Sequence, residues 1–153
     1  MDTNNNTSII QVFVTEDSLS HLAVEYACRL ASYTQQHIQL LYVLGPTKFQ
    51  HWLSVGKIMH QEGREQAEQL LLKHAVSVQE KTSQMPIIEI REGEFEEEIL
   101  QTFEKNKDIT HFIIADDSDK SGKSDLLTKI MSLTPKIPAI LSIVPKDLSP
   151  NDF

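Results

Sequence analysis

Apolar runs alternate with helical patterns along the whole chain. The runs Ile9 to Val14 and Ile38 to Leu44 each precede a segment whose apolar residues recur at spacings of three and four. Three further runs cover residues 87–91, 112–115 and 139–144. Parallel strands joined by helices are buried on both faces and have this near-continuous apolar character. Because such crossovers are right-handed, the pattern predicts an α/β fold, a three-layer doubly wound sheet of five parallel strands.

The length of 153 residues suits one domain. We expect this α/β domain to span residues 9–146, with tails at 1–8 and 147–153. A looser segment over 47–59 is expected to precede the long second helix, whose apolar spacing becomes regular from Ala67 onward.

Composition excludes several classes of partner. The net charge of −8 argues against nucleic acid and anionic membranes, because both require a basic face. No apolar run approaches the roughly 20 residues that span a bilayer, and residues 1–8 lack the basic and apolar regions of a secretory signal. Cys28 is the single cysteine, so it has no intramolecular partner and is expected to act as a small buried hydrophobe. We expect a cytoplasmic protein.

A polar loop follows the fourth apolar run. That run stops at Asp116 and Asp117, Asp119 comes next, and Gly122-Lys123-Ser124 precede a new helical pattern. In open α/β sheets, ligands bind beyond the carboxyl ends of the strands, so this loop is the expected place for a site. It combines groups that bind phosphate with acids that repel it.

Two classes of ligand fit parts of this loop. Residues 117–124 match the Walker-type pattern G-x-x-x-x-G-K-[ST] at every position except the first, where Asp117 replaces glycine. A weaker anion site on Ser121, Gly122, Lys123 and Ser124 at a helix N-terminus is the more modest version. Alternatively, Asp17, Asp116 and Asp117 would supply the oxygen ligands that Mg²⁺ or Ca²⁺ prefers.

Catalytic motifs are missing from the sequence. It contains neither an H-E-x-x-H pair nor a G-x-S-x-G elbow, and Cys28 lies within a predicted helix. The segment after the first strand, VTEDS, lacks the D-x-D-x-T pattern of haloacid-dehalogenase-type phosphatases. We therefore expect a protein that is not an enzyme.

An ordered set of short segments resembles the universal stress protein family over nearly the whole chain. These segments are VFVTEDS, IQLLYVL, IIEIREGEFEEEIL, ITHFIIADDSDKSGK and KIPAILSIVP. The resemblance implies the strand order 3-2-1-4-5, dimerisation in most members, and often ATP in the crevice between strands one and four.

The loop departs from the family's nucleotide-binding signature. Members that bind ATP carry an Asp after the first strand, where this chain has Thr15. They also carry a Gly-two-residue-Gly-nine-residue-Gly-Ser/Thr signature, whose first two glycines align with Asp116 and Asp119. A Cβ fills the space that lets backbone N–H groups approach phosphate, and a carboxylate adds repulsion. The candidate crevice residues are Thr15, Glu16, Asp17, Val43, Ala115, Asp116, Ser121, Gly122, Lys123 and Ser124.

The sequence therefore predicts a stress-response binding module that does not hold ATP in the family's usual manner and has no required cofactor. A homodimer is expected through the last strand, because the edge from Ile140 to Val144 would otherwise stay open and apolar. A protein partner is expected as well. The alternative is a stress sensor that binds nucleotide or phosphate through its divergent loop.

Overall fold

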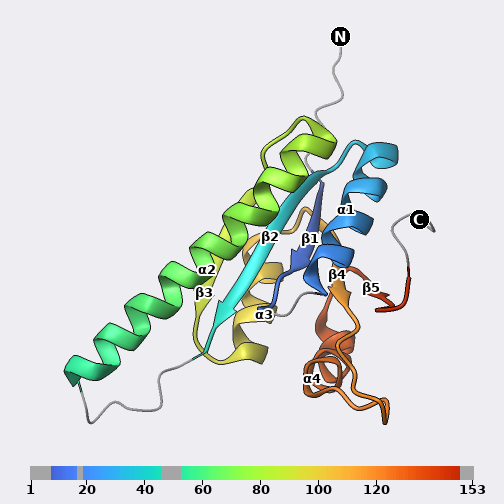
Figure 1. Ribbon diagram of the computed structural model, residues 1–153. Helices are drawn as coiled ribbons and strands as arrows, with labels where there is room; N and C mark the ends of the chain where they lie inside the picture. The colour runs from blue at the N-terminus through green and yellow to red at the C-terminus, as the bar shows by residue number, and fades with distance from the viewer. Residues whose placement is uncertain (1–7, 17–18, 46–52, 149–153) are drawn as a thin grey trace.

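The computed structural model describes residues 8–16, 19–45 and 53–148, with the backbone alone for 53–60. Strands and helices alternate along the chain, and a single sheet lies between two helical layers (Figure 1). In chain order the elements are β1 (Ile9–Phe13), α1 (Ser20–Thr34), β2 (His37–Leu44), α2 (Leu53–Thr82), β3 (Ile87–Glu92), α3 (Phe95–Lys105), β4 (Ile109–Ala115), α4 (Asp125–Leu133), a short 3₁₀ turn (Thr134–Lys136) and β5 (Ile140–Val144).

All strand pairs in the sheet are parallel, and the strand order is β3-β2-β1-β4-β5. Both the doubly wound class and the strand order are therefore confirmed. β1 lies at the centre, where Ile10 pairs with Ile38 of β2 and His111 of β4. Because β2 and β4 flank β1 on opposite sides, the chain reverses its winding at β1, and the ends of β1 and β4 form the switch point.

Side chains alternate along β1 between two apolar cores. Ile10, Val12 and Val14 pack in the core that also contains the buried residues of α1 and α2. Ile9 and Phe13 pack on the other face of the sheet, with buried residues of α3 and α4. This alternation follows from the pleat of a strand, and it decides which layer each functional side chain can reach.

A row of polar side chains crosses the sheet beneath α3. Gln11 is fully buried in β1 and donates a hydrogen bond to Thr102 Oγ1 of α3 at 3.0 Å. Its Oε1 accepts from Gln39 Nε2 at 2.7 Å, and Gln39 also donates to Glu89 Oε2 at 3.1 Å. Glu89 in turn accepts from Arg91 Nη1 at 2.8 Å. The row satisfies polar groups that would be costly to bury alone, and it runs from the centre of the sheet to its β3 edge.

The second helix is longer than the sequence predicted. The expected looser segment 47–59 is wrong from residue 53 onward, because α2 begins at Leu53. Its first turns extend past the strand ends in Figure 1, and the apolar spacing in the sequence becomes regular only from Ala67 onward. Residues 46–52 lie outside the described part of the chain. Within that part, no helix is both long and apolar enough to cross a membrane.

Protonation of His74 is expected to destabilise the fold. His74 is buried on α2, and its pKa is lowered by burial first and then by the charges of Lys73 and His21. The folded protein therefore binds fewer protons than the unfolded chain just below the ordinary histidine pKa of 6.5. Stability is complete above that pH and falls as the pH drops toward the lower folded-state pKa. Urea unfolding at about pH 7.5 and about pH 5.5 measures the loss.

The variants His74→Gln and His37→Gln separate this effect from general acid destabilisation. His74→Gln should flatten part of the pH dependence, whereas replacement of the exposed His37 should leave it unchanged. Burial also lowers the pKa of His111, so a residual dependence is expected in the His74 variant. If the stability of His74→Gln depends on pH in the same way as that of the wild type, protonation of His74 is not the cause of the loss.

Candidate functional site

Thr15, two residues after the end of β1, contacts Ser20, the first residue of α1. Its backbone N–H donates to Ser20 Oγ at 2.8 Å, and the two hydroxyl oxygens lie 3.1 Å apart. The Ser20 hydroxyl also lies 3.2 Å from the Thr15 carbonyl oxygen, and Ser20 is only 1% exposed. The polar groups of Thr15 are therefore engaged by the first turn of α1. Ser20 was not among the predicted site residues, because a serine near the start of a helix is typical of an ordinary cap.

Glu16 faces the β2 side of β1. Its Oε1 accepts a hydrogen bond from the Tyr42 hydroxyl at 2.9 Å. Burial, together with this contact, raises the pKa of Tyr42 to about 12. With Gln66, Ala67 and Leu70 of α2, the pair lines a small cavity. Because β4 lies on the opposite side of β1, Glu16 is engaged away from the acids of the β4 loop.

Asp116 continues the β4–β5 pairing beyond the last residue of β4. Its N–H donates to the Val144 carbonyl at 2.8 Å, and its Oδ1 accepts from the N–H of Ser118 at 2.8 Å. That backbone hydrogen bond is the main cause that lowers the pKa of Asp116, and Lys146 contributes. The Lys146 ammonium donates to the Ser118 carbonyl. The first turn of the loop is thus fixed to the end of β5.

Asp119 closes the middle of the loop on itself. Its Oδ1 accepts from Ser121 N–H at 2.8 Å, from Ser121 Oγ at 2.6 Å and from Lys123 N–H at 3.0 Å. The pKa of Asp119 is lowered, first by the hydrogen bond from the Ser121 side chain and second by the hydrogen bond from the Lys123 N–H. Gly122 between them has φ +83, in the left-handed region that favours glycine. The carboxylate therefore occupies the N–H groups of Ser121 and Lys123, two residues of the anion site that the sequence predicted.

Asp117 and Ser124 close the last part of the loop. Ser124 Oγ donates to Asp117 Oδ1 and accepts from Leu127 N–H at 3.0 Å, so it caps α4. Lys123 is exposed beside it. The Walker-like residues Lys123 and Ser124 are present at a helix N-terminus, but the loop before them is filled by its own carboxylates.

The remaining candidates are only partly brought together. Val43 packs against the core beneath α3 and α4, and Ala115 belongs to the core beneath α1 and α2, so their side chains lie on opposite faces of the sheet.

Asp17 lies outside the described residues. Within the described chain, no group of three His, Cys, Asp or Glu side chains is arranged to hold a metal ion. A cation site that includes Asp17 stays a prediction.

Cys28 is buried in α1, as expected. Burial raises the pKa of its thiol to about 11, so little reactive thiolate forms near neutral pH.

Comparison with known proteins places the fold. No protein-family model and no curated protein matches the sequence. Among solved structures, the universal stress protein UspA from Lactobacillus plantarum superposes with a TM-score of 0.77, covering 92% of this chain and 99% of that chain at 14% identity. The chain has the universal stress protein fold. The resemblance in the short sequence segments and the strand order are thus supported by three-dimensional similarity.

Two further universal stress proteins of this fold are similar over nearly the whole chain, and both structures contain a nucleotide. One, in complex with cAMP, has a TM-score of 0.68 and 12% identity, and it covers 92% of this chain and 98% of that chain. The other, from Archaeoglobus fulgidus in complex with dAMP, has a TM-score of 0.59 and 12% identity over 90% of this chain and 97% of that chain.

Proposed function

We propose that this protein is a universal-stress-type protein that acts as a non-catalytic binding module and does not hold ATP in a glycine-rich loop. The observation that carries the proposal is the Asp119 carboxylate, which accepts hydrogen bonds from the Ser121 and Lys123 N–H groups. Backbone N–H groups of a loop bind phosphate only when they are free to point at it. Here an internal anion already fills that position.

Electrostatics act in the same direction. A triphosphate at this loop would face the carboxylates of Asp116, Asp117 and Asp119. Two like unit charges about 4 Å apart repel by about 1 kcal/mol in water and about 4 kcal/mol near a protein surface. To bind, the ligand would have to displace Asp119 from its hydrogen bonds and then remain beside it. Weak or absent ATP binding follows.

The proposal includes a homodimer through β5. This strand pairs with β4 alone within the described chain, and Ile140 and Ile143 are 61% and 39% exposed. An exposed apolar strand edge is stabilised when a second copy covers it. These exposures support the dimer that the sequence analysis expected.

A thermal-shift titration tests the proposal. A ligand at about a hundred times its Kd stabilises the folded state by about 2.7 kcal/mol, and each kcal/mol raises the Tm of a domain of this size by about 2–4 °C. We expect no shift with millimolar ATP, with or without Mg²⁺. A saturable shift with ATP would overturn the proposal, and a shift with Mg²⁺ or Ca²⁺ alone would identify a cation site.

The second candidate function is a nucleotide sensor with a divergent loop. It is favoured by the cAMP and dAMP complexes of two proteins with this fold, and by the exposed Lys123 beside the capped start of α4. AMP and cAMP carry one phosphate and meet less repulsion than ATP. A shift with AMP or cAMP but not with ATP would support the sensor.

The variant Asp119→Gly shows whether loop closure is what excludes ATP. It frees the N–H groups of Ser121 and Lys123 and removes one negative charge, so an ATP-dependent Tm shift is expected in the variant only. Asp108→Gly removes the same charge just before β4, at the opposite end of that strand, and should leave ATP without effect. Equal ATP-dependent Tm shifts in the two variants would show that closure of the loop by Asp119 is not what excludes ATP.

A further inference from the structure

β3 forms the free edge of the sheet opposite β5. It pairs with β2 in regular register from Ile87 to Glu92, and no described strand lies on its other side. Natural proteins block such edges with prolines, bulges or charges that stand on the edge. The three charged residues of β3 are all held by neighbours within the protein. Arg91 lies beneath α3, where its side chain is only 10% exposed, Glu89 is bound by Gln39 and Arg91, and Glu92 is bound by Arg64. The backbone edge of β3 is left open to another strand.

Exposed apolar side chains lie on both sides of this edge. On β3, Ile87 is 46% and Ile88 is 36% exposed, and they point to opposite faces of the sheet. On α2, Leu72 and Val76 are 54% and 55% exposed and lie one helical turn apart on one face. We call Leu72, Val76, Ile87 and Ile88 the β3-edge surface.

The α2 and β3 parts of this surface lie at about the same distance from the Arg64–Glu92 contact, measured along the helix and along the strand. Arg64 Nη1 of α2 contacts Glu92 Oε1 at the end of β3, at 2.6 Å, and the two elements run in opposite directions from that contact. Ile88 lies about 13 Å back along the strand, and Leu72, eight residues after Arg64, lies about 12 Å along the helix. Ile88 shares its strand face with Ile90, which packs against the core beneath α2. Leu72 and Ile88 therefore flank the edge on the same side of the sheet.

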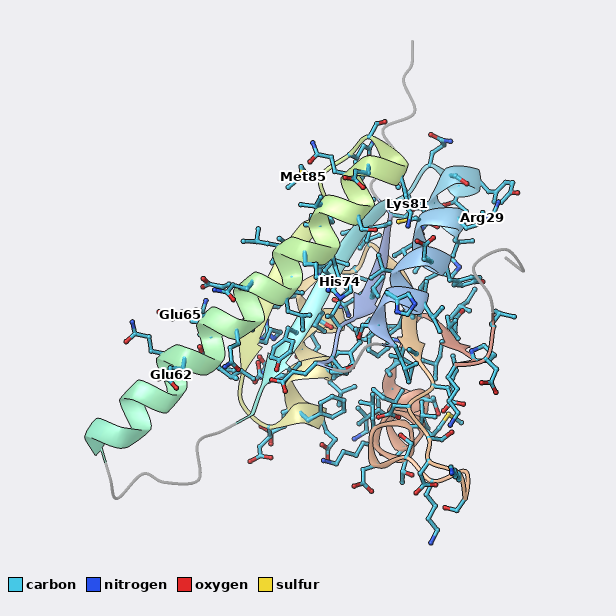
Figure 2. All side chains as sticks on the ribbon, viewed as in Figure 1. Arg29, Glu62, Glu65, His74, Lys81 and Met85 are labelled. Carbon is cyan, nitrogen blue, oxygen red and sulfur yellow. The ribbon has the colours of Figure 1, made fainter. Side chains whose placement is uncertain are left out.

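The surroundings of the β3-edge surface are acidic. Glu65 lies two turns before Leu72 on the same helix face, and Figure 2 shows Glu62 and Glu65 projecting on the side of α2 away from α1. Arg64 is shared between Glu68 and Glu92. The exposed Lys73 beside Leu72 is outnumbered by the exposed Glu62, Glu65 and Glu80 of the same helix. An occupant of this surface would meet exposed backbone groups, apolar side chains and a negative field.

We propose that the β3 edge binds an extended segment of a partner protein in which apolar and basic residues alternate, and that this segment adds a strand beside β3. Backbone hydrogen bonds to the edge supply affinity, and alternate side chains reach the apolar and acidic groups. A second copy of this chain fits less well, because it carries a net charge of −8 and would bring the same acids against this surface. The inference rests on the proposed binding-module function and assigns its partner class.

The test uses a fluorescein-labelled peptide of alternating lysine and valine, with a peptide of alternating glutamate and valine as its counterpart. Fluorescence anisotropy should show saturable binding of the lysine peptide, which weakens as salt is raised, and no binding of the glutamate peptide. Leu72→Lys with Val76→Lys should weaken binding by about tenfold or more, because apolar burial is lost and repulsion is added. Tyr33→Lys introduces a lysine at an exposed position of α1, on neither edge of the sheet, and should change affinity by less than about twofold.

Amide hydrogen exchange measures backbone pairing separately from affinity. Binding of the lysine peptide should slow amide hydrogen exchange within 87–92, and it should leave 140–144 unchanged. Failure of the lysine peptide to bind, equal binding of the two peptides, or an equal effect of the two sets of variants would overturn the inference. So would self-association in ultracentrifugation that the Leu72→Lys, Val76→Lys variant abolishes and Ile140→Lys does not, because a second copy would then occupy the edge. None of these outcomes depends on nucleotide, whereas the proposed function fails on an ATP-dependent thermal shift.

Discussion

Replacing Arg91 with leucine is expected to lower the free energy of unfolding by about 3 kcal/mol. The Arg91 side chain is 10% exposed, and its guanidinium donates to Glu89 Oε1 at 2.8 Å, to Glu98 Oε1 at 3.0 Å and to Gln101 Oε1 at 2.6 Å. Leucine fills part of the space but leaves two carboxylates without their cation. Glu98, whose side chain is 12% exposed, has little access to water in compensation. Urea unfolding followed by circular dichroism measures the loss.

Arg64→Leu is the matched control. Arg64 also contacts two glutamates, Glu68 and Glu92, but its side chain is 45% exposed. Exposed ion pairs contribute about 0–1 kcal/mol, so this variant should unfold close to the wild-type midpoint. Equal losses for Arg91→Leu and Arg64→Leu would show that burial of the Arg91 cluster is not what makes it stabilising.

The variant Phe112→Ala should cost about 4 kcal/mol, or a fall in Tm of roughly 8–16 °C for a domain of this size. Phe112 is fully buried in β4, and its ring packs edge-on against Phe13 at 6.4 Å and Phe103 at 5.6 Å between centroids. Alanine removes these contacts and leaves a cavity between the sheet and α3.

Phe112→Leu keeps most of the apolar volume and should cost about 1.5 kcal/mol. Both variants should keep the urea m-value of the wild type, since the surface exposed on unfolding is nearly unchanged. A loss for Phe112→Ala no larger than that for Phe112→Leu would mean that the core beneath α3 collapses around the cavity, contrary to the close packing described here.

The alternation of apolar runs and helices was sufficient to predict the fold class, because parallel strands buried on both faces leave a strong pattern. The strand order came from the family resemblance and not from periodicity. The two glutamines Gln11 and Gln39 show what hydrophobic periodicity alone cannot predict. Each interrupts an apolar strand in the sequence, and only the fold reveals that they are direct cross-strand neighbours that satisfy each other.

The site was predicted less well than the fold. The apolar runs correctly placed a loop after β4, whereas its role as a binding site stays a prediction. The directions of its side chains depend on local hydrogen bonds that no sequence pattern shows. Glu16 was expected beside the β4 acids and instead accepts a hydrogen bond from Tyr42, which the sequence analysis did not select. Asp119 was expected to obstruct phosphate through its Cβ and its charge, and the structure adds that its carboxylate occupies the N–H groups of Ser121 and Lys123.

We propose that the loop after β4 uses its own carboxylate, that of Asp119, in place of a bound phosphate. The most direct measurement is a titration of ¹⁵N-labelled protein with Mg²⁺–ATP, followed at the backbone amide resonances of Ser118, Ser121 and Lys123. We expect these resonances to stay in place at millimolar ATP in the wild-type protein and to move in Asp119→Gly. Saturable movement of the Ser121 and Lys123 resonances in the wild-type protein would contradict it, because the loop would then open to bind nucleotide.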